Sequence, residues 1–251
     1  DVVAWFNLAW IDPNWLERDP VLAALVEKGS CYTQDDIDII LAKQIEITRR
    51  VIPTLREMAG RGQIEVSASP YYHPILPLLI NTDAGRRPSP HLPLPAPAFS
   101  HPEDAEEQLR RAVEHHTRFY GAPPAGLWPS EGAVSAELVP MLSRHGLRWF
   151  ASDEAILVRS RNIGIDRDEY AHLRNPRFLY QPYRSADRPD APAIIFRDHV
   201  LSDRIGFVYQ HMDGVDAAND LIHRLKVIRD RLADANTPYL VSIILDGENC
   251  W

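Results

Sequence analysis

The sequence is poor in cysteine and has no excess of positive charge. Its 251 residues include two cysteines, Cys31 and Cys250, which are too few for a disulfide framework, so a reducing, cytoplasmic compartment is expected. The formal net charge is −8. This charge argues against a nucleic-acid partner and an anionic membrane surface, because both favour basic patches. No apolar run approaches the roughly 20 residues that a membrane-spanning helix needs.

Several signatures of known catalytic centres are missing as well. The sequence has no His-x-x-x-His and no closely paired cysteines, so no zinc site is expected. It has no nucleophile elbow that would support a Ser/His/Asp triad, and no glycine-rich phosphate loop. The sequence therefore predicts neither a metal ion nor another cofactor, and any catalysis is expected to depend on carboxylates.

Apolar strands alternate with helices along a chain long enough for one α/β barrel or two small domains. Strands are expected at residues 63–67, just before Glu131, and at 147–153, 193–199 and 239–246. Helices are expected from Thr33 to about Gly60 with an apolar inner face, and at 102–120, 135–142 and 214–233. This alternation predicts a parallel sheet that closes, or nearly closes, into a barrel.

The stretch Gly126-Leu127-Trp128-Pro129-Ser130-Glu131-Gly132 is the most informative part of the sequence. Pro123 and Pro124 end the preceding helix, so Glu131 is expected at the exit of a short strand and just before the next helix. In an α/β barrel this is where catalytic groups collect. The alternative is a glutamate that merely complements a helix dipole.

Acidic residues stand at or just beyond the ends of five predicted strands: Glu65, Glu131, Asp153, Asp198 and Asp246. Parallel strands point the same way, so these side chains are expected to converge on one edge of the sheet. A pair of carboxylates acting as nucleophile and acid/base is the apparatus of glycoside hydrolysis. Glu65 could equally be a solvent-facing strand residue.

Three segments resemble the conserved segments of glycoside hydrolase family 57, which includes α-amylases, amylopullulanases, 4-α-glucanotransferases and branching enzymes. They are Gly62-Gln63-Ile64-Glu65, the stretch from Gly126 to Glu131, and Leu245-Asp246-Gly247-Glu248-Asn249. The sequence at residues 69–76 and 196–207 is similar too. The resemblance extends from about Asn7 to Trp251, and the amylase and amylopullulanase branch is the most similar.

The resemblance implies an incomplete seven-stranded (β/α) barrel and a retaining mechanism on α-1,4-linked glucans, without a cofactor. Residues 1–251 would form a single catalytic domain that is truncated at both ends relative to the family. By motif position, Glu131 would be the nucleophile and Asp246 the acid/base. The candidate substrate-binding residues are Glu65, His73, Trp128, Asp153, Asp198, Glu248 and Trp251.

Some alternatives stay open at this point. Glu248 could raise the pKa of Asp246 by like-charge repulsion, or could simply belong to a turn. His73 could be a hydrogen-bonded structural group. The family's first motif, His-Gln-Pro, and its last motif are missing, so the sequence is expected to be the central part of a larger enzyme. A transferase, a branching enzyme or a catalytically silent carbohydrate-binding relative would share most of these features.

Overall fold

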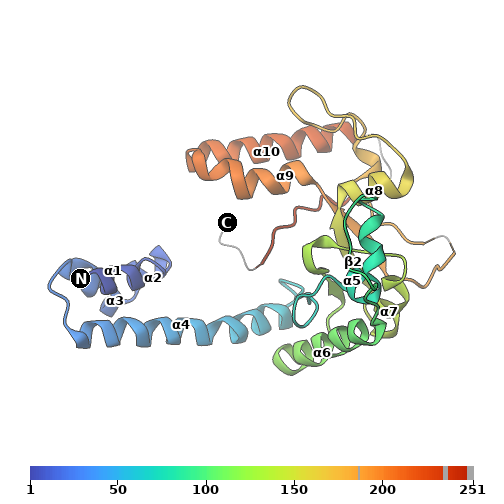
Figure 1. Ribbon diagram of the computed structural model, residues 1–251. Coiled ribbons are helices and arrows are strands. Elements are labelled where there is room, and N and C mark those ends of the chain that lie inside the picture. Colours follow the sequence, from blue (N-terminus) through green and yellow to red (C-terminus); the bar gives the residue numbers. More distant parts are fainter. Residues whose placement is uncertain (186, 234–236, 248–251) are drawn as a thin grey trace. The chain divides into compact units, whose positions relative to one another are not determined.

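The computed structural model describes residues 1–185, 187–233 and 237–247 (Figure 1). The chain divides into two compact units, Asp1–Glu65 and Val66–Trp251. Whether they act as the single domain expected from the sequence stays a prediction. In the part of the chain that the structure describes, no helix combines the length and the apolar character that crossing a membrane requires.

The first unit consists of four helices, α1 (Val2–Leu8), α2 (Pro13–Arg18), α3 (Pro20–Lys28) and α4 (Gln34–Gly60). Its core contains Ala4, Leu8, Ile11, Leu22, Leu25 and Ile40. Helix α4 begins with the cap expected from the sequence: Asp36 N donates to Thr33 Oγ1 over 3.3 Å, and Thr33 N donates to Asp36 Oδ2 over 2.7 Å. Reciprocal bonds of this kind satisfy two amide donors that the first turn leaves unpaired.

The apolar inner face predicted along α4 is only partly buried. Ile40 is fully buried and Ile37 and Ile47 pack around the core, but Ile45 is 53% exposed and Leu41 and Val51 are exposed too. The physical reason within this unit is the size of its partners, because α1, α2 and α3 are each at most nine residues long. Their core reaches only the first half of a helix of 27 residues.

The second unit contains a three-stranded parallel sheet in the order β1-β2-β3. Its strands are β1 (Gly126–Leu127), β2 (Trp149–Asp153) and β3 (Ala193–Arg197). The helices are α5 (Leu76–Ile80), α6 (Pro102–Tyr120), α7 (Leu138–Arg144), α8 (Glu154–Arg161), α9 (His199–Asp203) and α10 (Gly214–Arg231). Short 3₁₀ turns lie at Thr82–Arg86, Ser130–Gly132, Pro176–Phe178 and Tyr209–His211, and a π-helical turn lies at Arg204–Val208.

Two hydrophobic cores hold this sheet between its helices. The first joins β1 and β2 to α5, α6 and α7 through Leu127, Phe150, Leu76, Leu109 and Leu142. The second joins β3 to α8, α9 and α10 through Phe196, Leu157, Leu201 and Ile228. The α/β class with a parallel sheet is therefore confirmed. We call the side of the sheet where Leu127, Asp153 and Arg197 end their strands the carboxyl edge.

Two predicted strands are not formed as predicted. In residues 63–67 no strand is assigned; instead, Ala68 forms a parallel bridge to Leu127, with Ala68 N donating to Gly126 O over 3.0 Å. The ladder stays this short because β1 has only two residues, and Pro123, Pro124 and Pro129 around it have no N–H to donate. Glu65 therefore precedes the paired residue instead of following it.

Residues 239–246, predicted as a buried strand, form an extended segment without a strand assignment. Leu240 N donates to Tyr180 O over 2.9 Å, and Asp198 N donates to Ser242 O over 2.8 Å. Tyr239, Val241 and Ile243 pack on the second core, while Leu240 is exposed. Ser242 is buried, but the other residues of the segment are half-buried or exposed, so a strand buried on both faces was the wrong interpretation.

Candidate active site at the carboxyl edge of the sheet

Glu131 follows β1 at the carboxyl edge, in a 3₁₀ turn whose backbone is unusual. Its φ is 55° and its ψ is 22°, which is the left-handed region that residues other than glycine rarely adopt. The preceding Pro129 and Ser130 are buried, while Glu131 itself is exposed. Backbone strain of this kind persists where the surroundings fix the conformation, and it is concentrated at functional sites. The predicted place of Glu131, after a short strand and before helix α7, is confirmed.

Contacts on both sides hold this turn. Ser152, a buried residue of β2, donates its hydroxyl to Gly132 O over 2.6 Å. On the other side the indole of Trp128 covers Gly132 so closely that a Cβ at Gly132 would lie 3.2 Å from the ring. Gly132 has a φ of 63°, so glycine suits this position on both counts. The indole of Trp128 therefore packs over the residue that follows Glu131.

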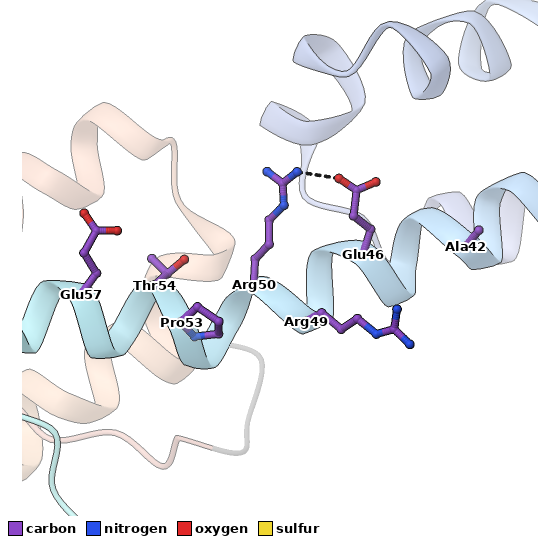
Figure 2. A pocket seen from close by; sticks show the side chains of 7 residues that line it. All are labelled: Ala42, Glu46, Arg49, Arg50, Pro53, Thr54 and Glu57. Atoms are coloured by element: carbon purple, nitrogen blue, oxygen red, sulfur yellow. Dashed lines mark hydrogen bonds and ion pairs between the residues drawn. The ribbon is translucent and has the colours of Figure 1, made fainter. Parts of the chain in front are cut away.

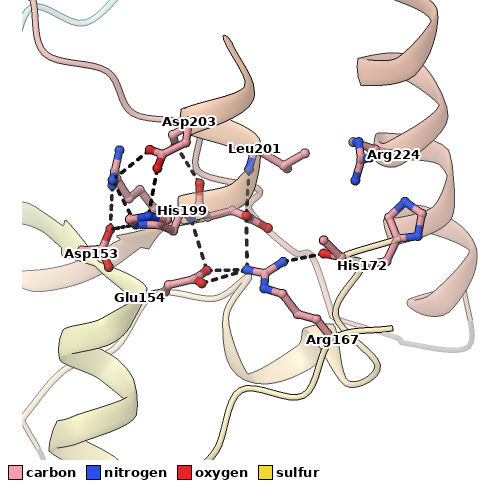
Figure 3. Close-up of polar contacts among 12 residues, drawn as sticks. Asp153, Glu154, Arg167, His172, His199, Leu201, Asp203 and Arg224 are labelled. Carbon is pink, nitrogen blue, oxygen red and sulfur yellow. Dashed lines mark hydrogen bonds and ion pairs between the residues drawn. The ribbon is translucent and has the colours of Figure 1, made fainter. Parts of the chain in front are cut away.

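Asp153 ends β2 and caps helix α8, accepting from Ala155 N over 2.9 Å. Its Oδ2 also accepts from Arg197 Nε over 2.7 Å and lies 2.9 Å from His199 Nδ1 (Figure 3). Burial alone would raise the pKa of Asp153, but the bonds from Ala155, His199 and Arg197 outweigh it and lower the pKa below its usual value. Asp153 is therefore an ionised group at the carboxyl edge, together with Arg197 and His199, which are not among the candidate residues expected from the sequence.

Asp198 lies directly after β3, as predicted, but it is only 1% exposed. It accepts hydrogen bonds from Tyr180 Oη and from Leu201 N, the latter over 3.0 Å, and Arg167 Nη2 lies 3.4 Å from its Oδ1. Because both carboxylate oxygens have protein partners in the interior, the surroundings of Asp198 favour a structural role over the sugar contact expected from its position.

A second buried carboxylate, Glu154, belongs to the same network (Figure 3). Arg167 Nη2 donates to both of its oxygens, over 2.8 and 2.7 Å, and His199 N donates to Oε2 over 3.2 Å. Burial raises the pKa of Glu154, and the neighbouring Asp198 adds to the shift, whereas Arg167 opposes it. Arg167 thus bonds to Glu154 after β2 and to Asp198 after β3, and it fixes the ends of the two strands relative to each other.

Asp246 ends the extended segment 239–246, which runs beside β3. Ile244, two residues earlier, donates its N–H to Ser202 Oγ over 3.1 Å, and Arg197 Nη1 lies 3.4 Å from Ile244 O. Together with the Asp198–Ser242 bond, these contacts tie the segment to β3 and α9. Asp246 itself is half-buried. The structure therefore connects the segments of Glu131, Asp153, Asp198 and Asp246 to the same small sheet.

The other predicted site residues are placed differently. His73 is exposed in the turn after Ala68 and has a φ of 57°. Glu65 is exposed and closes the first unit. Glu248 and Trp251 lie outside the described residues. The contacts of these residues with substrate stay predictions, as do the roles of Trp128 and Asp153.

Two hollows among the described residues have none of Glu131, Asp153 and Asp246 in their lining. One is lined by Ala42, Glu46, Arg49, Arg50, Pro53, Thr54 and Glu57 of α4 alone, with Arg50 paired to Glu46 (Figure 2). The other is a small interior space beside the Asp198 network, bordered by His172 and Arg224. Among the described residues, no group of three or more His, Cys, Asp and Glu side chains is arranged to hold a metal ion.

The fold and the site define an α/β protein with acidic residues assembled at the carboxyl edge of a parallel sheet. The family model described as glycosyl hydrolase family 57 matches residues 3–251, so the chain belongs to this family, and the resemblance seen in the sequence is confirmed. No curated protein sequence matches the chain.

Three solved structures resemble the chain in fold. The α-amylase AmyC from Thermotoga maritima is 12% identical, with a TM-score of 0.54 over 96% of this chain and 51% of that one. A GH57 branching enzyme from Thermococcus kodakaraensis is 13% identical, with a TM-score of 0.53 over 96% and 49%. The 4-alpha-glucanotransferase from Thermococcus litoralis is 18% identical, with a TM-score of 0.50 over 80% and 25%. The chain thus spans a quarter to a half of these proteins.

Proposed function

We propose that this chain carries the catalytic carboxylates of a retaining enzyme that acts on α-linked glucans. Its family supports the reaction class. The observation that carries the proposal is the strained, exposed position of Glu131 at the carboxyl edge, in a turn whose Gly132 is covered by Trp128. An exposed carboxylate in a fixed turn suits a nucleophile that must meet a sugar ring.

The proposal includes the incomplete seven-stranded (β/α) barrel. Extended segments lie side by side in the order Ala68, β1, β2, β3 and residues 239–246, each linked to the next by backbone hydrogen bonds. This order follows the chain, with helices between successive segments, as in a barrel.

In the proposed reaction the carboxylate of Glu131 attacks the anomeric carbon, while Asp246 donates a proton to the departing glycosidic oxygen. Water then attacks the glycosyl ester, passes its proton to Asp246, and releases Glu131. Such retention requires carboxyl groups about 5–5.5 Å apart, whereas a separation of about 6.5–9.5 Å indicates inversion. Trp128 would stack on the sugar, and Asp153 and His199 would offer hydrogen bonds to its hydroxyl groups. The cytoplasmic location stays a prediction.

Incubating the full-length protein with maltoheptaose, followed by chromatography, tests the activity. Shorter products alone indicate an α-amylase or amylopullulanase type of hydrolase. Longer products in addition indicate a 4-α-glucanotransferase, and new α-1,6 branches indicate a branching enzyme. An unchanged substrate would contradict the proposal and leave a carbohydrate-binding relative.

The Glu131→Gln variant tests the nucleophile. The amide cannot form the glycosyl ester, so turnover of maltoheptaose is expected to fall by at least about a thousandfold, while binding of the sugar persists. The matched control is Glu137→Gln, an exposed glutamate that is paired with Arg87 just before α7. A Glu131→Gln variant with the turnover of the control would exclude the assignment.

A further inference from the structure

Two serines of the second unit are completely buried, at 0% exposure: Ser152 in β2 and Ser202 in α9. Ser152 donates its hydroxyl to Gly132 O over 2.6 Å. Ser202 donates to Asp198 O over 2.7 Å and accepts from Ile244 N over 3.1 Å. One serine therefore holds the residue after Glu131, and the other holds the residue two positions before Asp246.

The bond from Ser152 acts on a strained turn. Glu131 has a positive φ, which is unfavourable for a residue with a Cβ, so the turn needs contacts that hold it in this conformation. Ser152 lies in the central strand, which is hydrogen-bonded to both β1 and β3. The hydroxyl thus fastens a strained turn to the best-supported strand of the sheet, and it fixes the backbone from which the Glu131 side chain extends.

The bond to Ser202 acts on a segment with an incomplete ladder. Residues 239–246 are extended but not part of an assigned strand, and Ile244 N is bound by a side chain instead of a neighbouring backbone carbonyl. Ser202 is also bonded to Asp198 O at the end of β3. Its hydroxyl therefore fixes the segment relative to that strand. Without the hydroxyl, the part of the segment just before Asp246 would be held less firmly.

We propose that Ser152 and Ser202 are positioning residues for the two halves of the catalytic pair, Ser152 for the nucleophile and Ser202 for the acid/base. This inference rests on the proposed function, in which Glu131 and Asp246 have those roles. It adds that each carboxylate depends on its own buried hydroxyl, so the two serines affect different parts of the reaction.

The chemistry of the first step separates the two roles. With a glucan, the Glu131 oxygen forms a bond to the anomeric carbon, the glycosidic C–O bond breaks, and the leaving oxygen takes the proton of Asp246. With an α-glycosyl fluoride the same ester forms, but fluoride leaves as a stable anion and needs no proton. A displaced acid/base therefore slows the first reaction far more than the second, whereas a displaced nucleophile slows both.

The experiment compares Ser152→Ala, Ser202→Ala and the control Ser100→Ala in the full-length protein. Ser100 donates its hydroxyl to Ile80 O over 2.8 Å and takes no part in the site. The value of kcat/KM is measured with maltoheptaose and with α-maltotriosyl fluoride, because it reports the step that forms the ester. Thermal unfolding of each variant is measured alongside.

Ser202→Ala is expected to lower kcat/KM for maltoheptaose on the order of tenfold or more, and that for the fluoride by less than about threefold. Ser152→Ala is expected to lower both values by the same factor. Ser202→Thr, which keeps the hydroxyl, is expected to restore the selectivity of the wild type. Where an alanine variant does not fold, the cysteine variant at that position fills the site with a slightly larger thiol, weakens the hydrogen bond and is expected to give the same ratio.

Equal losses with both substrates in the Ser202 variants would overturn the assignment of Ser202, and a selective loss in the Ser152 variants would overturn that of Ser152. Variants that behave like Ser100→Ala would overturn both while leaving the proposed function intact. A wild-type protein that turns over neither substrate would instead reject the proposed function, and the positioning roles with it.

Discussion

His172 shows how a single buried group makes stability depend on pH. Its side chain is only 9% exposed. Burial lowers the pKa of His172, and nearby Arg224, Arg231 and His223 add to the shift against the opposing effect of Asp168. In the unfolded chain, His172 binds a proton near the ordinary pKa of about 6.5, whereas in the folded chain it binds one only at lower pH. Protonation therefore favours the unfolded state as the pH falls below that value.

The resulting prediction concerns urea unfolding measured between pH 7.5 and pH 5.5. The wild type is expected to lose stability as the pH falls through this window, and His172→Gln is expected to reduce the loss, because glutamine takes up no proton in either state. His211→Gln, at an exposed histidine, is the control. Parallel curves for wild type and His172→Gln would contradict the expectation.

Sequence reasoning located the acidic residues but not their partners. The change from apolar to charged residues at the ends of β2 and β3 indicated Asp153 and Asp198; Asp153 does end β2, and Asp198 does follow β3. Nothing near Asp198 in the sequence points to Arg167, which lies 31 residues away, or to Tyr180, which lies 18 residues away. A position after a strand is a local property, whereas burial and pairing arise only when distant segments fold together.

Among the elements, β1 depends on a close approach that only glycine allows. A Cβ at Gly126 would lie 1.9 Å from the Trp149 ring, and Trp149 is the residue that pairs with Gly126. Gly126→Ala is expected to destabilise the second unit by about 2–4 kcal/mol in urea unfolding, since either the backbone or the ring must shift to make room for the methyl group. Combining it with Trp149→Leu should recover part of the loss.

Gly60→Ala is the matched control for this substitution, because no atom lies within 4 Å of the added Cβ at the end of α4. It is expected to leave stability unchanged or to raise it slightly. A Gly126→Ala protein as stable as Gly60→Ala would show that Trp149 moves aside easily.

Whether a predicted strand formed depended on how many hydrogen-bonded neighbouring segments it has. The expected strands at 147–153 and 193–199 are confirmed as β2 and β3, which pair along their whole length. The alternating pattern at 63–67 and the apolar run at 239–246 also predicted strands, but they produced a single bridge and an extended segment. Side-chain alternation reports extension and burial, while a ladder needs backbone partners that a local pattern cannot reveal.

For the whole molecule, two compact units with separate cores predict stepwise unfolding. Leu22 is fully buried in the first unit and Leu142 in the second, each in its own core. In calorimetry, Leu22→Ala and Leu142→Ala are each expected to cost about 2–5 kcal/mol and to lower different transitions. If both substitutions shift one common transition, the two units unfold together and the expectation is wrong.

The family and the α/β class could be predicted for the whole molecule, because several family motifs occur in the expected order along most of the chain. The division into units could not, since the sequence between Thr33 and Gly60 shows a strong helix without showing how far its partners extend along it. The predicted barrel depends in the same way on segments whose pairing the sequence does not specify.

The left-handed backbone of Glu131 sets the stability of the protein against the proposed catalytic role of this residue. Glycine adopts that conformation freely, so Glu131→Gly would relieve about 1 kcal/mol of strain while deleting the carboxylate. A single substitution would therefore give a protein that is more stable but inactive. Screening libraries of this chain for thermal resistance alone would enrich that substitution, and its absence among natural relatives would be the mark of selection for turnover.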